Sequence, residues 1–152
     1  MVKEIIKILK KRGHTITFAE SCTGGRVSSA FTTISGVSSI LNGAVITYSN
    51  GIKSQWLNVK ESTLIKYGAV SSQCVSEMLD GIIKLANAEG AIAVSGIAGP
   101  SGGTEEKPVG TVYIGIKYLD KIIIKHYLFN GSREEIQQEA TNKAIKLFFK
   151  NL

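Results

Sequence analysis

Residues 15–26, TITFAESCTGGR, join an apolar segment, the polar run ESCT and two glycines in direct succession. The apolar segment predicts a strand over residues 14–19, and the small residues after it predict a helix over residues 24–34. A strand that leads directly into a helix is the repeating unit of α/β folds. The stretch therefore indicates an α/β domain, with the polar residues 20–23 at the carboxyl end of its first strand.

The same alternation of helix and strand continues on both sides of this stretch. Apolar residues at helical spacing predict a helix near the N-terminus that ends at Gly13, and a longer amphipathic helix over residues 71–88. Residues 52–67 are expected to hold one or two short helices. Further strands are predicted over residues 42–48, 91–95, 109–118 and 122–129.

The last part of the chain completes the predicted architecture. A short turn separates the last two predicted strands, which favours an antiparallel hairpin. Ser132 and Glu135 form an S-x-x-E capping box that begins the final helix. We therefore predict a three-layer α/β/α domain with a mixed, mostly parallel sheet and a C-terminal helix, as a single domain over residues 1–152.

The composition is that of an ordinary globular domain. The chain has 152 residues, of which 43% are hydrophobic and 20% charged, enough to bury a core without disulfides or metals. Cys22 and Cys74 form no CxxC pair, which argues against a zinc site or a disulfide framework and favours the reducing cytoplasm. Lysines interrupt the N-terminal segment and no run of eighteen apolar residues occurs, so we expect no signal peptide and no membrane span.

The formal net charge of +6 comes from lysines and arginines that are scattered along the chain. Such charge aids solubility, and it also attracts small anionic substrates such as phosphate esters. A nucleic-acid-binding domain would combine its basic residues with interleaved aromatic residues or a known motif. Because neither accompanies the charge in this chain, we expect no nucleic-acid partner.

Three loops that follow predicted strands are unusually rich in polar residues and glycine. They cover residues 20–25, 49–53 and 96–107. In mostly parallel sheets, ligands bind beyond the carboxyl ends of the strands. We therefore expect these three loops to form the functional site.

In the first loop, Ser21 allows two interpretations. It could simply cap the helix that follows. Gly24 and Gly25 favour a second interpretation, because they let the backbone approach a ligand and leave the first helical N–H groups to bind an anion. Ser21 would then be a nucleophile, and Cys22 is its rival, although a buried cysteine is also a common core residue.

A serine nucleophile needs a base, and the two histidines are poorly placed to serve. His14 and His126 lie in or beside predicted strands, so we interpret them as structural or exposed residues. Serine–lysine pairs are a known variant of the catalytic triad. Lys53 is the candidate, although most lysines are solvated surface charges and a lysine acts as a base only when burial or a nearby cation lowers its pKa.

Polar residues precede Lys53 in the segment TYSNGIK, residues 47–53. Tyr48 could hydrogen-bond the base or stack on a substrate ring. Asn50 could shape the turn or hold a substrate amide.

The third loop, residues 95–110 (SGIAGPSGGTEEKPVG), leaves a buried strand and is dense in glycine. It matches neither the Walker A pattern nor the dinucleotide-binding pattern. It is therefore either a cradle for a nucleotide or phosphate, or a mobile surface loop. Arg133, just inside the last helix, could add a phosphate contact.

Taken together, three long motifs resemble the CinA C-terminal domain family. They are AESCTGGRVSSAFTTISGVSSILNGAVITYSNGIKSQWLNV (residues 19–59), GAVSSQCVSEML (68–79) and AVSGIAGPSGGTEEKPVGTVYIGI (93–116). Stand-alone members of this family are nicotinamide-nucleotide amidohydrolases. The resemblance implies hydrolysis of nicotinamide mononucleotide to nicotinate mononucleotide and ammonia, in pyridine-nucleotide recycling.

The resemblance also implies roles for individual residues. It makes Ser21 and Lys53 a catalytic pair and places Tyr48 in the same site. It assigns substrate binding to the glycine-rich loop and the last helix, namely Gly99, Ser101, Gly102, Gly103, Thr104 and Arg133. We further predict that the first loop and the following turn bind substrate through Glu20, Thr23, Gly24, Gly25 and Asn50.

The resulting hypothesis is a Ser-Lys amidohydrolase that uses no metal and no cofactor. Neutral Lys53 takes the proton of Ser21, and backbone N–H groups of residues 22–25 or of the glycine-rich loop bind the oxyanion. The expected partners are a pyridine nucleotide and further copies of the chain, as a dimer or larger homo-oligomer. Two alternatives stay open: a non-catalytic nucleotide-binding module, and a competence- or DNA-damage-associated protein.

Overall fold

A single mixed sheet with the strand order β2-β1-β3-β4-β5 forms the centre of the computed structural model, which describes residues 1–152. β1 (Ile16–Glu20) pairs in parallel with β2 (Leu41–Ile46) on one side and with β3 (Gly90–Gly96) on the other. β4 (Thr111–Tyr118) is antiparallel to β3, and β5 (Lys121–Leu128) is antiparallel to β4. Only β4 therefore runs against the other strands, which confirms the mixed, mostly parallel sheet.

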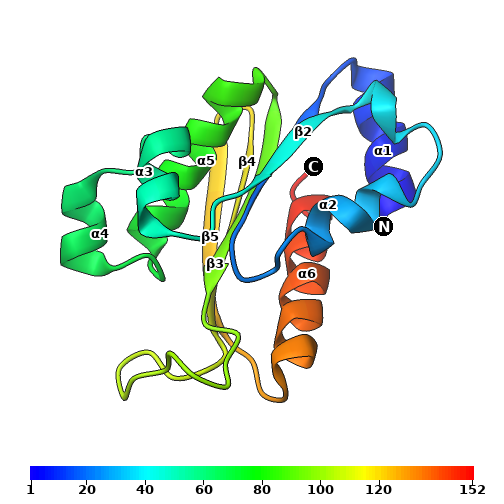
Figure 1. The fold of residues 1–152 in the computed structure, drawn as a ribbon. Helices are drawn as coiled ribbons and strands as arrows, with labels where there is room; N and C mark the ends of the chain where they lie inside the picture. Colours follow the sequence, from blue (N-terminus) through cyan, green and yellow to red (C-terminus); the bar gives the residue numbers. More distant parts are fainter.

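Helices cover both faces of this sheet and complete the three predicted layers (Figure 1). The short 3₁₀ helix η1 (Val37–Ser39) precedes β2 in the chain. None of these helices combines the length and the apolar character that a membrane span requires. The first layer contains α1 (Val2–Arg12), α2 (Arg26–Thr32) and α6 (Arg133–Phe149), and the second contains α3 (Asn50–Leu57), α4 (Glu61–Tyr67) and α5 (Ser72–Ala86).

β1 is buried along its whole length, and its alternating side chains supply both cores. Phe18 packs against Phe31 of α2, with the ring centroids 4.8 Å apart. Ala19 points to the opposite core, which α5 covers. The same alternation sends Glu20 toward α2 and Ser21 toward α3, where each side chain finds its hydrogen-bond partner.

The position of α3 depends on a close contact with α5. A Cβ atom at Gly81 of α5 would lie 2.0 Å from the backbone oxygen of Leu57, so the end of α3 rests directly on the α5 backbone. Leu57 lies one helical turn after Lys53 on the buried face of α3. The missing side chain at Gly81 thus sets how deeply Lys53 enters the domain.

The predicted elements occur in the predicted order and differ mainly at their ends. β2 ends at Ile46, two residues earlier than predicted, because the next two carbonyl groups turn toward Lys53. α2 begins one residue after Gly25, whose φ of 96° is left-handed and cannot continue a helix. The segment predicted to hold one or two short helices holds two, α3 and α4. The capping box of Ser132 and Glu135 is confirmed.

Adding a methyl group at Gly81 should test the contact between α3 and α5. We expect Gly81→Ala to lower the free energy of unfolding by about 1–3 kcal/mol, the usual cost of overpacking a tight contact. Urea unfolding measures this change. Gly51→Ala is the matched control, because Gly51 lies in α3 with open space around it, and it should be neutral or stabilising. Wild-type stability in Gly81→Ala would contradict the close contact.

Candidate active site

The site begins with a buried contact between a serine and a lysine from neighbouring chain segments. Ser21 directly follows β1, and Lys53 lies in the first turns of α3, which begins just after β2. Because β1 and β2 are parallel neighbours, their carboxyl ends bring the two segments together. Lys53 Nζ lies 3.2 Å from Ser21 Oγ. The exposed fractions are only 7% for Ser21 and 1% for Lys53.

The Lys53 amine is buried among hydrogen-bond acceptors and has no anionic partner. Nζ donates hydrogen bonds to the backbone oxygens of Thr47 (2.7 Å) and Tyr48 (3.2 Å), and no carboxylate pairs with it. Desolvation on burial lowers the pKa of Lys53 below its ordinary value. A neutral amine has two N–H groups and one lone pair. With both N–H groups held by carbonyls, the lone pair is left to accept the hydroxyl proton of Ser21.

Glu20 holds the loop that carries Ser21. Its buried carboxylate accepts hydrogen bonds from Thr23 Oγ1 (2.6 Å), Gly25 N (3.0 Å) and Val27 N (3.1 Å) through Oε2. Its other oxygen, Oε1, accepts from the backbone N and the hydroxyl of Ser28. We predicted that the first helical N–H groups would be free for a ligand, but Glu20 already occupies them. Glu20, Thr23 and Gly25 therefore shape the loop.

Two N–H groups of this loop are left for another acceptor. The N–H of Gly24 donates to Ser21 O, and that of Arg26 donates to Thr23 O. The N–H groups of Cys22 and Thr23 donate no hydrogen bond to another residue of the chain. They directly follow the candidate nucleophile, which is the usual place for donors to an oxyanion.

The two buried thiols near Lys53 are poor nucleophiles. Burial raises the pKa of Cys22 to about 12 and that of Cys74 to about 11. Both thiols therefore stay protonated and leave the lysine without a negatively charged neighbour. This argues against Cys22 as a rival to Ser21.

The histidines lie away from the serine, as predicted. His14 Nδ1 is 2.7 Å from the hydroxyl of Tyr118, at the opposite end of the sheet. The ring of His126 stacks on Tyr113 with the centroids 4.8 Å apart. Neither ring hydrogen-bonds Ser21.

Arg133 connects Tyr48 to the glycine-rich loop. Its Nη1 donates to Gly99 O (2.6 Å), and its Nη2 donates to the hydroxyl of Tyr48 (2.8 Å). Tyr48 is 59% exposed, and it contacts Lys53 through its backbone oxygen and not through its phenol. The structure thus brings three predicted site residues together, but it separates the phenol of Tyr48 from the base.

The tip of the glycine-rich loop stays apart from the Ser21–Lys53 pair. Ser101, Gly102, Gly103 and Thr104 are exposed, and no hydrogen bond joins them to that pair. Within the loop, Thr104 N donates to the Lys107 backbone oxygen. Figure 1 shows the loop extending beyond the sheet.

Some of the glycines in this loop serve the fold of the loop itself. A Cβ atom at Gly99 would lie 2.4 Å from a methyl group of Val109, and one at Gly103 would lie 2.7 Å from Val109 N. These two glycines are therefore required by close packing on Val109. Their presence alone does not indicate a ligand.

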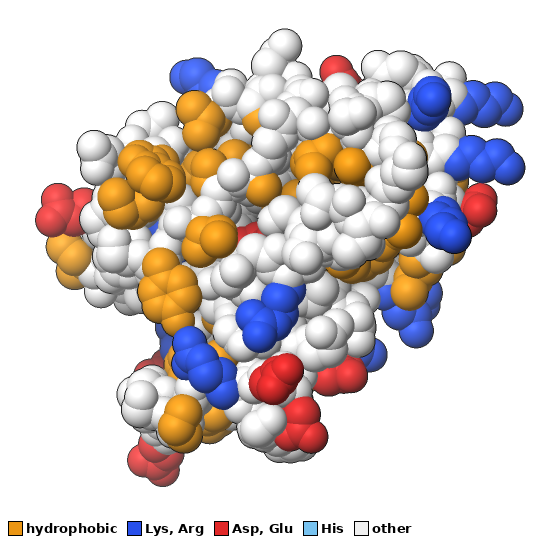
Figure 2. All heavy atoms as spheres, turned by 45° about the vertical axis from the view of Figure 1, so that its right-hand side comes forward, with side chains coloured by type: hydrophobic (Ala, Val, Ile, Leu, Met, Phe, Trp, Pro, Cys, Tyr) orange, Lys and Arg blue, Asp and Glu red, His pale blue; other side chains and the backbone are white.

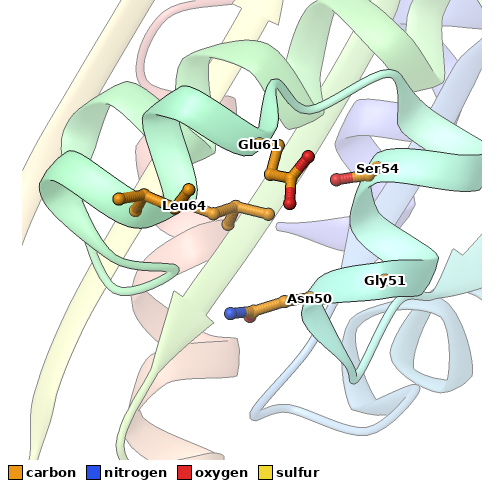
Figure 3. Close-up of a pocket in the computed structure, with 6 residues that line it drawn as sticks. Asn50, Gly51, Ser54, Glu61 and Leu64 are labelled. Atoms are coloured by element: carbon orange, nitrogen blue, oxygen red, sulfur yellow. The ribbon is translucent and has the colours of Figure 1, made fainter.

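Asn50 faces a pocket that neither Ser21 nor Lys53 lines. The pocket has a volume of about 380 Å³ and opens between α3 and α4. Figure 3 shows the Asn50 side chain directed into it, with Glu61 and Leu64 contributed by α4. No hydrogen bond connects Asn50 to Lys53. Asn50 is exposed whereas Lys53 is buried, so the two side chains lie in different surroundings.

Three residues of the site were missed from the sequence. Gln137 of α6 is buried, and its Nε2 donates to Cys22 O at 2.8 Å, which fixes the loop from the far layer. Cys74 and Thr47 are buried near Lys53. The alternation of β2 offered a signal for Thr47, because it is the residue that continues the strand beside Ser21. The sequence carries no comparable signal for Gln137.

Comparison with known proteins places this geometry in one family. The model of the CinA C-terminal domain matches residues 1–152. A "CinA-like protein" of Thermotoga neapolitana is 45% identical over 152 residues, which cover 100% of this chain and 37% of that protein. A "putative competence-damage inducible protein" of Thermoanaerobacter pseudethanolicus is 42% identical and is matched over 36% of its length. The chain thus spans little more than a third of these relatives.

Solved structures agree with the fold. The competence damage-inducible protein A of Klebsiella pneumoniae superposes with a TM-score of 0.93 at 37% identity, covering 97% of this chain and 91% of that chain. The competence/damage inducible protein of Agrobacterium tumefaciens gives a TM-score of 0.95 at 34% identity, with 98% and 92% covered. The three-layer fold is therefore shared with experimental structures.

The buried carboxylate of Glu20 makes a stability prediction. Glu20→Gln would replace an acceptor oxygen by an NH₂ group that faces N–H donors, so we expect the free energy of unfolding to fall by roughly 2–4 kcal/mol. Urea unfolding is the measurement. Glu135→Gln is the matched control, because this exposed carboxylate only closes a helix cap and its replacement should cost much less. If the two variants were equally stable, Glu20 would not hold the loop as described.

Proposed function

The chain belongs to the CinA C-terminal domain family, and on that premise we propose that it hydrolyses the carboxamide of nicotinamide mononucleotide. The products are nicotinate mononucleotide and ammonia. The observation that carries the proposal is the 3.2 Å contact between Ser21 Oγ and the buried Lys53 amine, which has no carboxylate partner. The choice of substrate rests on the resemblance of the sequence motifs to the amidohydrolases of the family.

Acylation begins with Lys53 in its neutral form. Its lone pair takes the proton of Ser21 while Oγ attacks the carboxamide carbon. The carbonyl oxygen becomes an oxyanion, which accepts hydrogen bonds from the free N–H groups of Cys22 and Thr23. The positive pyridinium ring of the substrate polarises the amide and disfavours a second positive charge on Lys53.

The leaving group departs with the proton that Lys53 has taken up. Lys53 gives this proton to the amide nitrogen, the C–N bond breaks, and ammonia leaves an ester on Ser21. Water then attacks the ester while Lys53 takes its proton, and Ser21 recovers that proton as the product acid departs. The proton that leaves with ammonia is replaced by one from water, so Ser21 and Lys53 end the cycle in the protonation states in which they began it.

Phosphate recognition falls to Arg133 in this proposal. Its guanidinium group contacts only the neutral acceptors Gly99 O and Tyr48 Oη, so its charge is not balanced by a carboxylate. Ser101 and Thr104 add exposed hydroxyl groups on the neighbouring loop.

We place the reaction in the cytoplasm, because its reducing conditions suit the two free thiols. From the family resemblance we also propose a homo-oligomer of two or more chains.

Other functions find less support in the molecule. The relatives' competence-damage names raise an association with DNA, but Figure 2 shows basic side chains dispersed over the visible face without a continuous track. A nucleotide-binding module without catalysis would have no need for a desolvated lysine beside a serine. The arrangement of Ser21 and Lys53 therefore favours an enzyme.

Removing either member of the pair should abolish turnover. We expect Ser21→Ala and Lys53→Ala to reduce ammonia release from nicotinamide mononucleotide about a thousandfold or more, because nucleophile and base act as a unit. The nicotinate product is identified by chromatography, and nicotinamide riboside serves as the unphosphorylated control. Lys66→Ala, an exposed lysine at the end of α4, and Cys22→Ala should keep most of the activity.

Each contrary outcome has a definite meaning. A fully active Ser21→Ala would exclude the serine mechanism, and an inactive Cys22→Ala with intact stability would point to the thiol. A wild-type protein that binds the nucleotide without releasing ammonia would contradict the proposed reaction and favour the binding module.

The lowered pKa of Lys53 predicts the pH dependence. Because the neutral amine is the active form, kcat/KM should rise with pH and level off below the ordinary lysine pKa of about 10.4. On the acid side, the rate should fall about tenfold per pH unit as the ammonium form accumulates. Steady-state rates across this range measure the profile, with circular dichroism at each pH as the check on folding. A rate that still rises tenfold per unit at the ordinary lysine pKa would contradict a buried neutral base.

A further inference from the structure

The side-chain oxygen of Thr47 is buried and makes no hydrogen bond, unlike every other buried side-chain oxygen in the chain. The residue is 0% exposed, and its Oγ1 has no partner. Other buried hydroxyl groups are paired: Thr23 donates to Glu20, and Ser95 donates to Ala69 O. Burying an unpaired hydroxyl group lowers the stability of the fold, so a threonine at this position calls for an explanation.

The strand register places this hydroxyl beside the catalytic pair. Glu20 is opposite Ile46, and Thr47 N donates to Glu20 O at 2.9 Å, so Thr47 continues β2 next to Ser21. Val45, two residues earlier, packs into the core under α5, and the alternation of the strand directs Thr47 to the same side. Lys53 lies on that side and binds the backbone oxygen of Thr47.

The polarity of the surrounding groups orients the reacting carboxamide. The backbone oxygens of Thr47 and Tyr48 are acceptors beside Lys53, and they would repel an oxyanion. The free N–H donors at Cys22 and Thr23 suit the carbonyl oxygen instead. The amide nitrogen, which carries two N–H donors and must receive a proton from Lys53, therefore lies on the Lys53 side.

We propose that Thr47 Oγ1 accepts a hydrogen bond from the carboxamide nitrogen of the substrate, and then from the water that takes the place of ammonia. This inference rests on the proposed function and deepens it. Thr47 forms and breaks no covalent bond. It aligns the leaving nitrogen with Lys53 during acylation and aligns the water with the same lysine during hydrolysis of the ester.

The test compares Thr47→Val, which keeps the shape and removes the hydroxyl, with Thr47→Ser, which keeps the hydroxyl. We expect Thr47→Val to lower kcat for nicotinamide mononucleotide about 10- to 100-fold, the effect of losing one hydrogen bond to a reacting group. Its resistance to urea should equal or exceed that of the wild type, because an unpaired buried hydroxyl has been removed. Thr47→Ser should stay within a few-fold of wild-type kcat.

A second readout separates this role from the nucleophile itself. A fluorophosphonate probe reacts with an activated serine and expels fluoride, so its reaction involves no leaving nitrogen. Thr47→Val should label Ser21 at the wild-type rate, and Ser21→Ala should not label at all. A more stable protein with intact labelling but impaired amide hydrolysis is a combination that a purely structural threonine would not produce.

The remaining outcomes overturn the inference. Wild-type turnover in Thr47→Val shows that the hydroxyl does not serve the amide nitrogen. Slow labelling in Thr47→Val shows that Thr47 acts on the Ser21–Lys53 pair and not on the substrate. A wild-type protein that labels but does not hydrolyse the nucleotide rejects the proposed substrate and, with it, this assignment. A wild-type protein that neither labels nor hydrolyses rejects the serine mechanism as a whole.

Discussion

The contact between Lys53 and Ser21 depends on holding an amine inside the domain without a counter-ion. Taking a charged ammonium out of water is costly, so burial favours the neutral amine. Two backbone oxygens, those of Thr47 and Tyr48, satisfy its N–H groups. The end of β2 supplies both oxygens, and the packing of α3 on Gly81 sets the depth of the lysine. The distance between Ser21 and Lys53 therefore depends on how the end of β2 and the helices α3 and α5 pack together.

The pleat of β1 keeps the nearest buried carboxylate from the amine. Glu20 and Ser21 are consecutive, so their side chains point to opposite faces of the sheet. The Glu20 carboxylate accepts hydrogen bonds from N–H groups at the start of α2, while Ser21 contacts Lys53 on the other side of the sheet. A carboxylate beside Lys53 would favour the ammonium form and remove the base. The alternation of side chains along the strand thus keeps the Glu20 carboxyl group away from Ser21 and Lys53.

The sequence predicted the layers and the hairpin from the periodicity of its segments, and the Ser21–Lys53 pair from the positions of the two residues after neighbouring strands together with the family motifs. It did not reveal structural contacts that form only when the loop and the helices have folded, and the binding roles assigned to Glu20 and Asn50 stay predictions. Glu20 looked like a ligand contact because its five donors become visible only once α2 is folded around it. Asn50 lines a pocket that does not include Lys53, and Thr47 stood out only because every other buried side-chain oxygen has a hydrogen-bond partner.

The central claim is that Lys53 is a neutral base, and its own titration tests this most directly. The NMR signal of the labelled ε-carbon of Lys53 can be followed with pH in the folded protein and identified by its loss in Lys53→Met. The account predicts a midpoint well below the ordinary lysine pKa of about 10.4, with the other lysines titrating near that value. A midpoint for Lys53 at or above the ordinary value would contradict the account, because the amine would then be charged and unable to accept the proton of Ser21.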